Sequence, residues 1–98
     1  MMKPIFLSKF KHSKSISLLS LNIQSLPAKF SEFNSFVSEL MQSKFTFDFI
    51  ALQEIWSLND PDIYNLTEYH PIVHKSRPAR NGGGVGFYIK KCWNFIVL

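Results

Sequence analysis

SISLLSLN (residues 15–22) and FDFIALQE (residues 47–54) are two apolar runs, and each ends on a polar residue. Ile16, Leu18, Leu19 and Leu21 lie on both faces of the first run, and the FIAL block (residues 49–52) of the second is continuously apolar, so both are expected to be interior strands covered on both faces. Between them, apolar residues recur at three- and four-residue spacing from Phe30 to Met41, which predicts an amphipathic helix that begins near Ser25 or Leu26. A strand, a helix and a strand in this order are typical of a βαβ unit with parallel strands. The stretch therefore predicts an α/β fold.

The polar residues that end these two strands, Asn22 and Glu54, are the candidate site residues. Parallel neighbours lie ~4.8 Å apart, and ligands of open α/β sheets bind outside the carboxyl ends of the strands. Glu54 is a candidate metal ligand, because Mg²⁺ is typically held by one or two carboxylates together with water and substrate phosphate. The amide of Asn22 can bind a phosphate oxygen or orient a catalytic group. The alternatives are a surface glutamate and an asparagine that only caps the turn into the helix.

The second half of the sequence predicts further strands around a glycine-rich connection. Residues 69–75 and 85–90 are β-like, residues 59–62 form a turn signal that can open a short helical turn, and another strand is expected from residue 94. The run GGGVG (residues 82–86) lacks the Lys-Ser/Thr of a P-loop and leads into a strand, which favours positive-φ backbone over a nucleotide cradle. Arg77, Arg80 and Asn81 beside it are candidate contacts to a nucleic-acid backbone.

The composition is typical of one packed domain, since 46% of the 98 residues are hydrophobic. The single cysteine, Cys92, cannot form an internal disulfide, so a reducing compartment, the nucleus or the cytoplasm, is expected. No apolar stretch approaches the ~20 residues that span a bilayer, and no membrane partner is expected. Residues 1–14 carry four lysines and no acid, which predicts a basic flexible leader, with a mitochondrial presequence as the alternative.

The net charge of +4 is unevenly distributed along the chain. All seven acidic residues lie within residues 32–68, whereas residues 1–14 and 75–91 hold nine of the eleven bases and no acid. A uniformly basic nucleic-acid-binding surface is therefore not indicated. The pattern suits an enzyme of polyanions whose acids surround a metal site and whose bases flank it, and ordinary solvated faces are the alternative.

Three motifs together resemble a known enzyme family. LLSLNIQSL (residues 18–26), FDFIALQEIW (residues 47–56) and NGGGVGFYIKK (residues 81–91) resemble, in order and spacing, the first part of the endonuclease/exonuclease/phosphatase superfamily, with residues 15–98 covered. Within it the chain is most similar to the apurinic-type endonuclease domain of non-LTR retrotransposons. The resemblance implies a four-layer α/β sandwich, two β-sheets with outer helices. It also implies that Glu54 binds Mg²⁺ or Mn²⁺, that Asn22 organises the phosphate site, and that the partner is DNA.

The chain also departs from the family. Gln24 stands where relatives that repair abasic sites often carry an acid, which favours the retrotransposon branch. The later Gly-Asp-x-Asn and Ser-Asp-His motifs are absent from the 98 residues. The resemblance therefore implies the N-terminal half of a truncated domain, inactive as an isolated chain. An exposed sheet face would then be covered by the missing C-terminal half or by another protein.

Two other functions stay open on the sequence alone. The first is a non-catalytic module that uses the same half-fold to bind nucleic acid or protein. The second is a relative with a different substrate, similar to the sphingomyelinases or the inositol phosphatases, because the first-half motifs are shared across these substrates. The sequence downstream of Leu98 is the observation that would separate a fragment of a nuclease from the other two.

Overall fold

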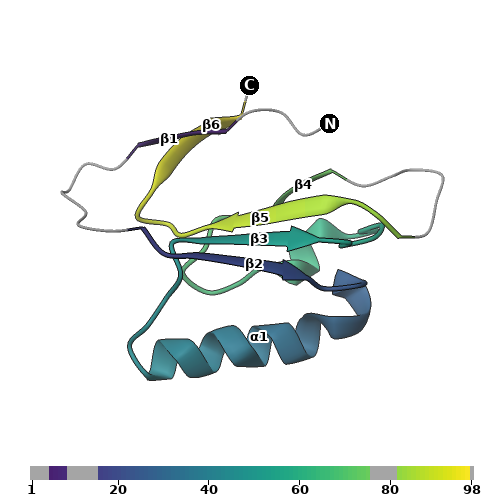
Figure 1. Cartoon of the computed structure of the whole chain (residues 1–98), viewed down its shortest axis with the longest axis horizontal. Coiled ribbons are helices and arrows are strands. Elements are labelled where there is room, and N and C mark those ends of the chain that lie inside the picture. The colour runs from purple at the N-terminus through teal and green to yellow at the C-terminus, as the bar shows by residue number, and fades with distance from the viewer. Residues whose placement is uncertain (1–4, 9–15, 76–81, 98) are drawn as a thin grey trace.

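A four-stranded mixed sheet with one long helix along one face forms the centre of the molecule (Figure 1). The computed structural model describes residues 5–8, 16–75 and 82–97. The elements, in chain order, are β1 (Ile5–Ser8), β2 (Leu18–Asn22), α1 (Leu26–Gln42), β3 (Phe49–Gln53), the 3-10 helix η1 (Pro61–Tyr64), β4 (Val73–Lys75), β5 (Val85–Ile89) and β6 (Asn94–Val97). The sheet has the order β2-β3-β5-β4. An α/β fold is therefore confirmed.

The βαβ unit predicted from the first half of the chain is present. β2 and β3 are parallel and paired from Leu18 opposite Phe49 to Asn22 opposite Gln53, and α1 connects them. β5 is antiparallel to both β3 and β4. Strand order and direction together place the carboxyl ends of β2 and β3 at one edge of the sheet (Figure 1).

Local chemistry explains where α1 begins. Ser25 is the N-cap, and its hydroxyl accepts a hydrogen bond from the backbone N–H of Ala28 at 3.2 Å. Pro27 lies in the first turn, where its missing N–H would have no intrahelical partner. Both residues confirm the predicted start of the helix. Among the described residues, no helix combines the length and apolarity that crossing a membrane requires.

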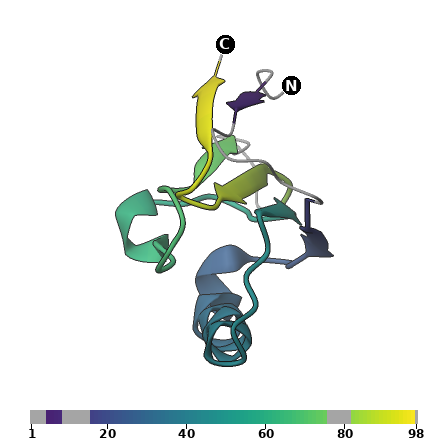
Figure 2. The ribbon, with the colours of Figure 1, turned by 90° about the vertical axis from the view of Figure 1, so that its left-hand side faces the viewer.

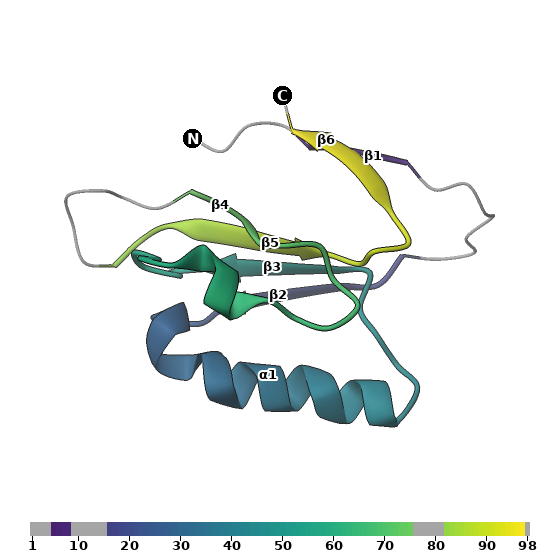
Figure 3. The ribbon, with the colours of Figure 1, turned by 180° about the vertical axis from the view of Figure 1, so that it is seen from behind.

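The hydrophobic core lies between α1 and one face of the sheet. Ile50, Leu52 and Tyr88 from β3 and β5 are completely or almost completely buried against Phe33 and Val37 of the helix. η1 lies on the same side of the sheet (Figure 3), and its Tyr64 carbonyl accepts a hydrogen bond from the Tyr88 hydroxyl at 2.6 Å. The predicted helical turn after residue 59 is thus present as η1 and closes one side of the core.

The expectation that residues 15–22 form an interior strand covered on both faces is wrong. β2 is the edge strand of the sheet, and Ile16 and Leu18 are 57% and 60% exposed. The register alternates side chains, so only every second residue of β2 faces α1. On the opposite side, Trp93 packs on Phe49 with ring centroids 5.2 Å apart at one end of the sheet, and no layer made of described residues covers Leu18.

A two-stranded ribbon lies on the side of the sheet away from α1 (Figure 2). β1 pairs antiparallel with β6, from Ile5 opposite Val97 to Ser8 opposite Asn94. The strand expected from residue 94 is thus present. Within the segment expected to be a basic flexible leader, residues 1–14, the described residues 5–8 form β1, and the leader itself stays a prediction.

The strand expected over residues 69–75 is shorter than predicted. β4 covers only its last three residues, and Tyr69 contributes a single bridge to Lys90. Pro71 has no backbone N–H to donate to a ladder, which accounts for the interruption.

Two buried tyrosines make the stability of this core depend on pH. Burial, reinforced by the nearby Asp48 carboxylate, raises the pKa of Tyr69 to about 12, although its hydroxyl donates to the Phe47 carbonyl at 2.6 Å. Burial also raises the pKa of Tyr88 above its ordinary value. The folded state therefore keeps both phenol protons at a pH where the unfolded chain releases them.

We expect the free energy of unfolding to be independent of these tyrosines below pH 10 and to fall as the pH rises from 10 towards 12. Each raised tyrosine contributes a slope of about 1.4 kcal/mol per pH unit in that window. Urea unfolding at several pH values, with tyrosinate absorbance as the titration signal, measures the slope. Tyr69→Phe should be less stable at neutral pH, because the Phe47 carbonyl loses its donor, and should show a shallower slope. A free energy of unfolding that does not change across the window would contradict the prediction.

Candidate metal and phosphate site

The structure places Asn22 and Glu54 at the same edge of the sheet. Asn22 is the last residue of β2 and lies opposite Gln53, so Glu54 is one residue beyond the partner of Asn22. The pairing continues past the strand ends, because Ile23 N–H donates to the Gln53 carbonyl at 3.0 Å and Ser25 N–H to the Glu54 carbonyl at 2.8 Å. The two segments are therefore held side by side where both candidate residues leave the sheet.

A third segment joins this edge from the start of β5. Trp56 N–H donates to the Gly83 carbonyl at 2.9 Å, and Ile55 N–H donates to the Gly84 carbonyl at 3.4 Å. Gly83 and Gly84 have φ values of 71° and 83°, a conformation that glycine adopts without a steric penalty. The glycine run thus supplies positive-φ backbone, and it positions the segment that follows β3.

Strained backbone is concentrated at this edge. Six residues other than glycine have positive φ among the described residues, and four of them lie in the two segments that follow β2 and β3: Gln24, Ser25, Glu54 and Trp56. Glu54 has a φ of 57° and Trp56 a φ of 63°, both in the left-handed region. This conformation costs an L-residue about 1–2 kcal/mol and persists where the surroundings impose it, commonly at functional sites.

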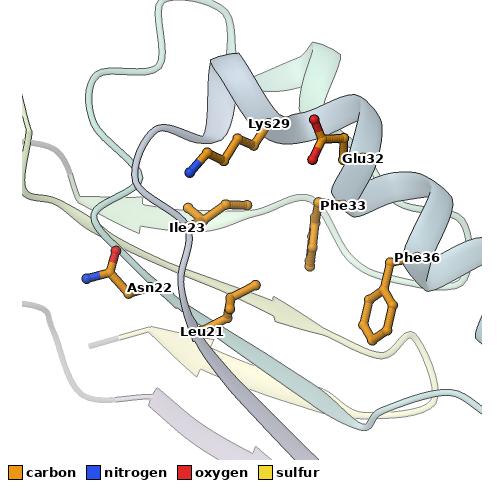
Figure 4. A pocket seen from close by; sticks show the side chains of 7 residues that line it. All are labelled: Leu21, Asn22, Ile23, Lys29, Glu32, Phe33 and Phe36. Carbon is orange, nitrogen blue, oxygen red and sulfur yellow. The ribbon is translucent and has the colours of Figure 1, made fainter.

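Asn22 has one interaction in the turn and one group left to donate. Its side-chain oxygen accepts a hydrogen bond from Gln24 N–H at 3.2 Å, so the residue does cap the turn, which was the alternative to a role at the site. Figure 4 shows its amide pointing away from α1, and the residue is exposed. With the oxygen engaged, the amide nitrogen is the group that can bind an anion, because it carries two N–H donors.

The environment of Glu54 fits a magnesium ligand. The residue is half-buried, and its carboxylate makes no hydrogen bond or ion pair with any described residue. Within the described part of the chain, no three His, Cys, Asp or Glu side chains are grouped so as to hold a metal by themselves. Mg²⁺ accepts a single carboxylate when water and substrate phosphate complete its shell. One carboxylate, with an amide residue at the end of the neighbouring strand, is a donor set that such a site can use.

A hollow of about 290 Å³ lies between β2 and α1 and was not foreseen from the sequence (Figure 4). The residues that line it are Leu21, Asn22, Ile23, Lys29, Glu32, Phe33 and Phe36. Its interior is apolar, with one lysine and one glutamate from α1 at the rim, and Glu54 is not part of it. Asn22 therefore lies between two features of the surface. One is the polar edge with Glu54, and the other is the apolar hollow beside α1.

Arg77, Arg80 and Asn81 lie outside the described residues, so their predicted contact to nucleic acid stays a prediction. Trp56 was not singled out, although it follows Glu54 by two residues and is 38% exposed. A large aromatic residue two positions after a candidate site glutamate is the signal that would have indicated it.

A scan against models of protein families matches none of them to this chain, and a search of curated proteins finds no match. The assignment of a role to this edge therefore depends on its geometry and on the motifs quoted above.

The strain at Glu54 leads to a stability prediction. Glu54→Gly should raise the free energy of unfolding by about 0.5–1 kcal/mol, because glycine removes the left-handed penalty at a smaller entropic cost. Chemical denaturation measures the difference. Lys44→Gly is the matched control, since Lys44 is an exposed residue with a φ of 62° away from this edge. If Lys44→Gly stabilises and Glu54→Gly destabilises, the Glu54 side chain contributes to folding and the strain argument for a functional role fails.

Proposed function

We propose that this chain is the N-terminal portion of a magnesium-dependent DNA endonuclease domain of the retrotransposon type, and that Asn22 and Glu54 form its metal and phosphate edge. The observation that supports the proposal is the parallel pairing of β2 and β3, which brings to neighbouring strand ends an amide and a carboxylate that has no hydrogen bond or ion pair with a described residue. The concentration of left-handed residues at the same edge is independent support.

The two side chains would have distinct roles in phosphodiester hydrolysis. Glu54 would hold Mg²⁺ or Mn²⁺, and the bound cation would polarise the phosphate and neutralise charge that develops on it. The amide nitrogen of Asn22 would donate to a non-bridging phosphate oxygen and so orient the phosphate against the cation. The hydrogen bond from Gln24 N–H to Asn22 fixes which end of the amide faces the substrate.

The same proposal predicts that these 98 residues bind the metal and the phosphate but do not hydrolyse DNA. Hydrolysis also requires a group that activates water and a group that stabilises the leaving or attacking oxygen. In the family that the chain resembles, those groups belong to the Gly-Asp-x-Asn and Ser-Asp-His motifs, which the 98-residue sequence lacks. Loss of one such group typically lowers a rate by about 100-fold or more, so loss of several removes measurable cleavage.

The four-layer sandwich belongs to this proposal as well. A second sheet would pack on the side of the first sheet that faces away from α1. Register places Leu18, Ala51 and Phe87 on that side, with Leu18 60% exposed and the other two half-buried. Partly exposed apolar residues on one side of a sheet favour a covering layer, because burying them is worth roughly 25 cal/mol per Å².

A non-catalytic interaction module is the second candidate, and the same apolar side of the sheet favours it. A protein that covers Leu18 and Phe87 would bury that apolar surface, and it would not require a catalytic or metal-binding role for Glu54. DNA binding by such a module would weaken steeply with salt, because it would depend on lysine and arginine contacts to phosphates. It would be indifferent to divalent metal and to Glu54→Gln.

Manganese titration of the isotopically labelled chain tests the metal edge. Mn²⁺ should broaden the amide resonances of residues 22–25 and 53–56 at lower concentrations than it broadens other amide resonances, because paramagnetic relaxation is confined to nuclei near the ion. Glu54→Gln should abolish that selective broadening by removing the only charged ligand proposed there. Glu39→Gln is the matched control, since Glu39 is an exposed glutamate on α1, and it should leave the pattern unchanged. Broadening centred elsewhere, or insensitive to Glu54→Gln, would refute the metal assignment.

Supercoiled plasmid provides the test of turnover. We expect no Mg²⁺-dependent nicking by the 98-residue chain above a buffer control, for the reason that the activating groups are missing. Nicking that requires Mg²⁺ and disappears in Glu54→Ala would show that the chain completes a catalytic site without those motifs.

A further inference from the structure

Trp56 is a large aromatic side chain held at the candidate site without being buried. It follows Glu54 by two residues, is 38% exposed, and has a φ of 63°. Left-handed backbone is a genuine outlier for a bulky residue, so its retention here needs a compensating reason. The buried residue of this segment is Ile55, at 0% exposure, and Trp56 does not belong to the buried core.

The glycine run holds the tryptophan in place. Trp56 N–H donates to the Gly83 carbonyl at 2.9 Å, which fixes the backbone from which the side chain projects. A Cβ built on Gly82 would lie 3.5 Å from Nε1 and 3.9 Å from Cδ1 of the indole, so the ring edge lies against the bare backbone of Gly82. One edge of the indole is therefore supported by the glycine run, and the residue as a whole is 38% exposed.

The position of the indole relative to Glu54 suits one nucleotide. Two residues span at most ~7 Å of backbone, so a phosphate at Glu54 would place its own base within reach of Trp56. Aromatic side chains bind unpaired bases of any identity by stacking, since every base has a π-face. The net charge of +4 favours a polyanionic partner for the chain as a whole, and the bases nearest in sequence to the glycine run at this edge are those of residues 75–91.

We propose that Trp56 is a stacking platform for an unpaired DNA base whose phosphate lies at the Asn22–Glu54 edge. The position of the phosphate rests on the proposed function, whereas stacking itself requires no metal. Trp56 is then a residue that binds substrate and selects single-stranded or distorted DNA. Glu54 and Asn22 bind the backbone and do not distinguish paired from unpaired bases.

Intrinsic fluorescence gives a direct measurement, because the chain has two tryptophans and the other, Trp93, is only 6% exposed. Oligothymidylate added in EDTA should quench the emission of the wild-type chain. An oligonucleotide of equal length that lacks bases should not quench, because it offers phosphates without a π-face. A fully paired duplex should quench far less than oligothymidylate.

Two variants separate stacking from a structural role. Trp56→Phe should keep binding oligothymidylate, measured by the anisotropy of a labelled strand, but should lose the quenching, since Trp93 alone then emits. Trp56→Leu should weaken binding roughly 5- to 150-fold, the equivalent of one stacked base. Circular dichroism verifies that both variants remain folded, as an exposed side chain allows.

The outcomes also distinguish this inference from the proposed function. Quenching by oligothymidylate that persists in Glu54→Gln and in EDTA supports the platform even if the manganese experiment fails. Equal quenching by the base-free strand, unchanged affinity in Trp56→Leu, or no quenching by any oligonucleotide would each overturn it. The last result is what a tryptophan that contacts a protein would produce.

Discussion

The parallel pairing of β2 with β3, continued beyond the ends of both strands, is the constraint on which the rest of the molecule depends. Three hydrogen bonds carry it past the sheet, from the N–H groups of Ile23, Ser25 and Leu26 to the carbonyls of residues 53–55. These bonds satisfy donors at the start of α1 that would otherwise lack partners, and they hold the segment after β3 in place. The start of the helix and the candidate site are thus consequences of one continuous ladder.

The backbone conformation at this edge of the sheet lowers the stability of the fold. The ladder imposes left-handed conformations on Glu54 and Trp56, while the core that resists this strain lies one layer away, around Ile50, Leu52 and Tyr88. A small domain has little stability in reserve, because its net folding free energy is a small difference between large terms. Residues other than glycine with positive φ cost stability wherever they occur, at Glu54 and Trp56 as at Lys44 and Glu68.

Much of the fold could be predicted from the sequence because its signals are local. Apolar runs, a helical stripe and the Ser25–Pro27 start signal predict the βαβ unit, and the same spacing places Asn22 and Glu54 together. The exposure of β2 could not be predicted, since Leu18 and Leu19 look alike in sequence and only the layers around them decide which is covered. The pairing of β1 with β6 links residues some 90 positions apart, and no local pattern encodes such a contact.

The place of β2 at the margin of the sheet has a consequence for how this surface can be occupied. Its outer backbone groups have no strand beside them among the described residues, and exposed edges of this kind recruit extended chains. Asn22 ends that edge and also borders the hollow beneath α1. An extended chain added alongside β2 would therefore end beside Asn22 and the hollow.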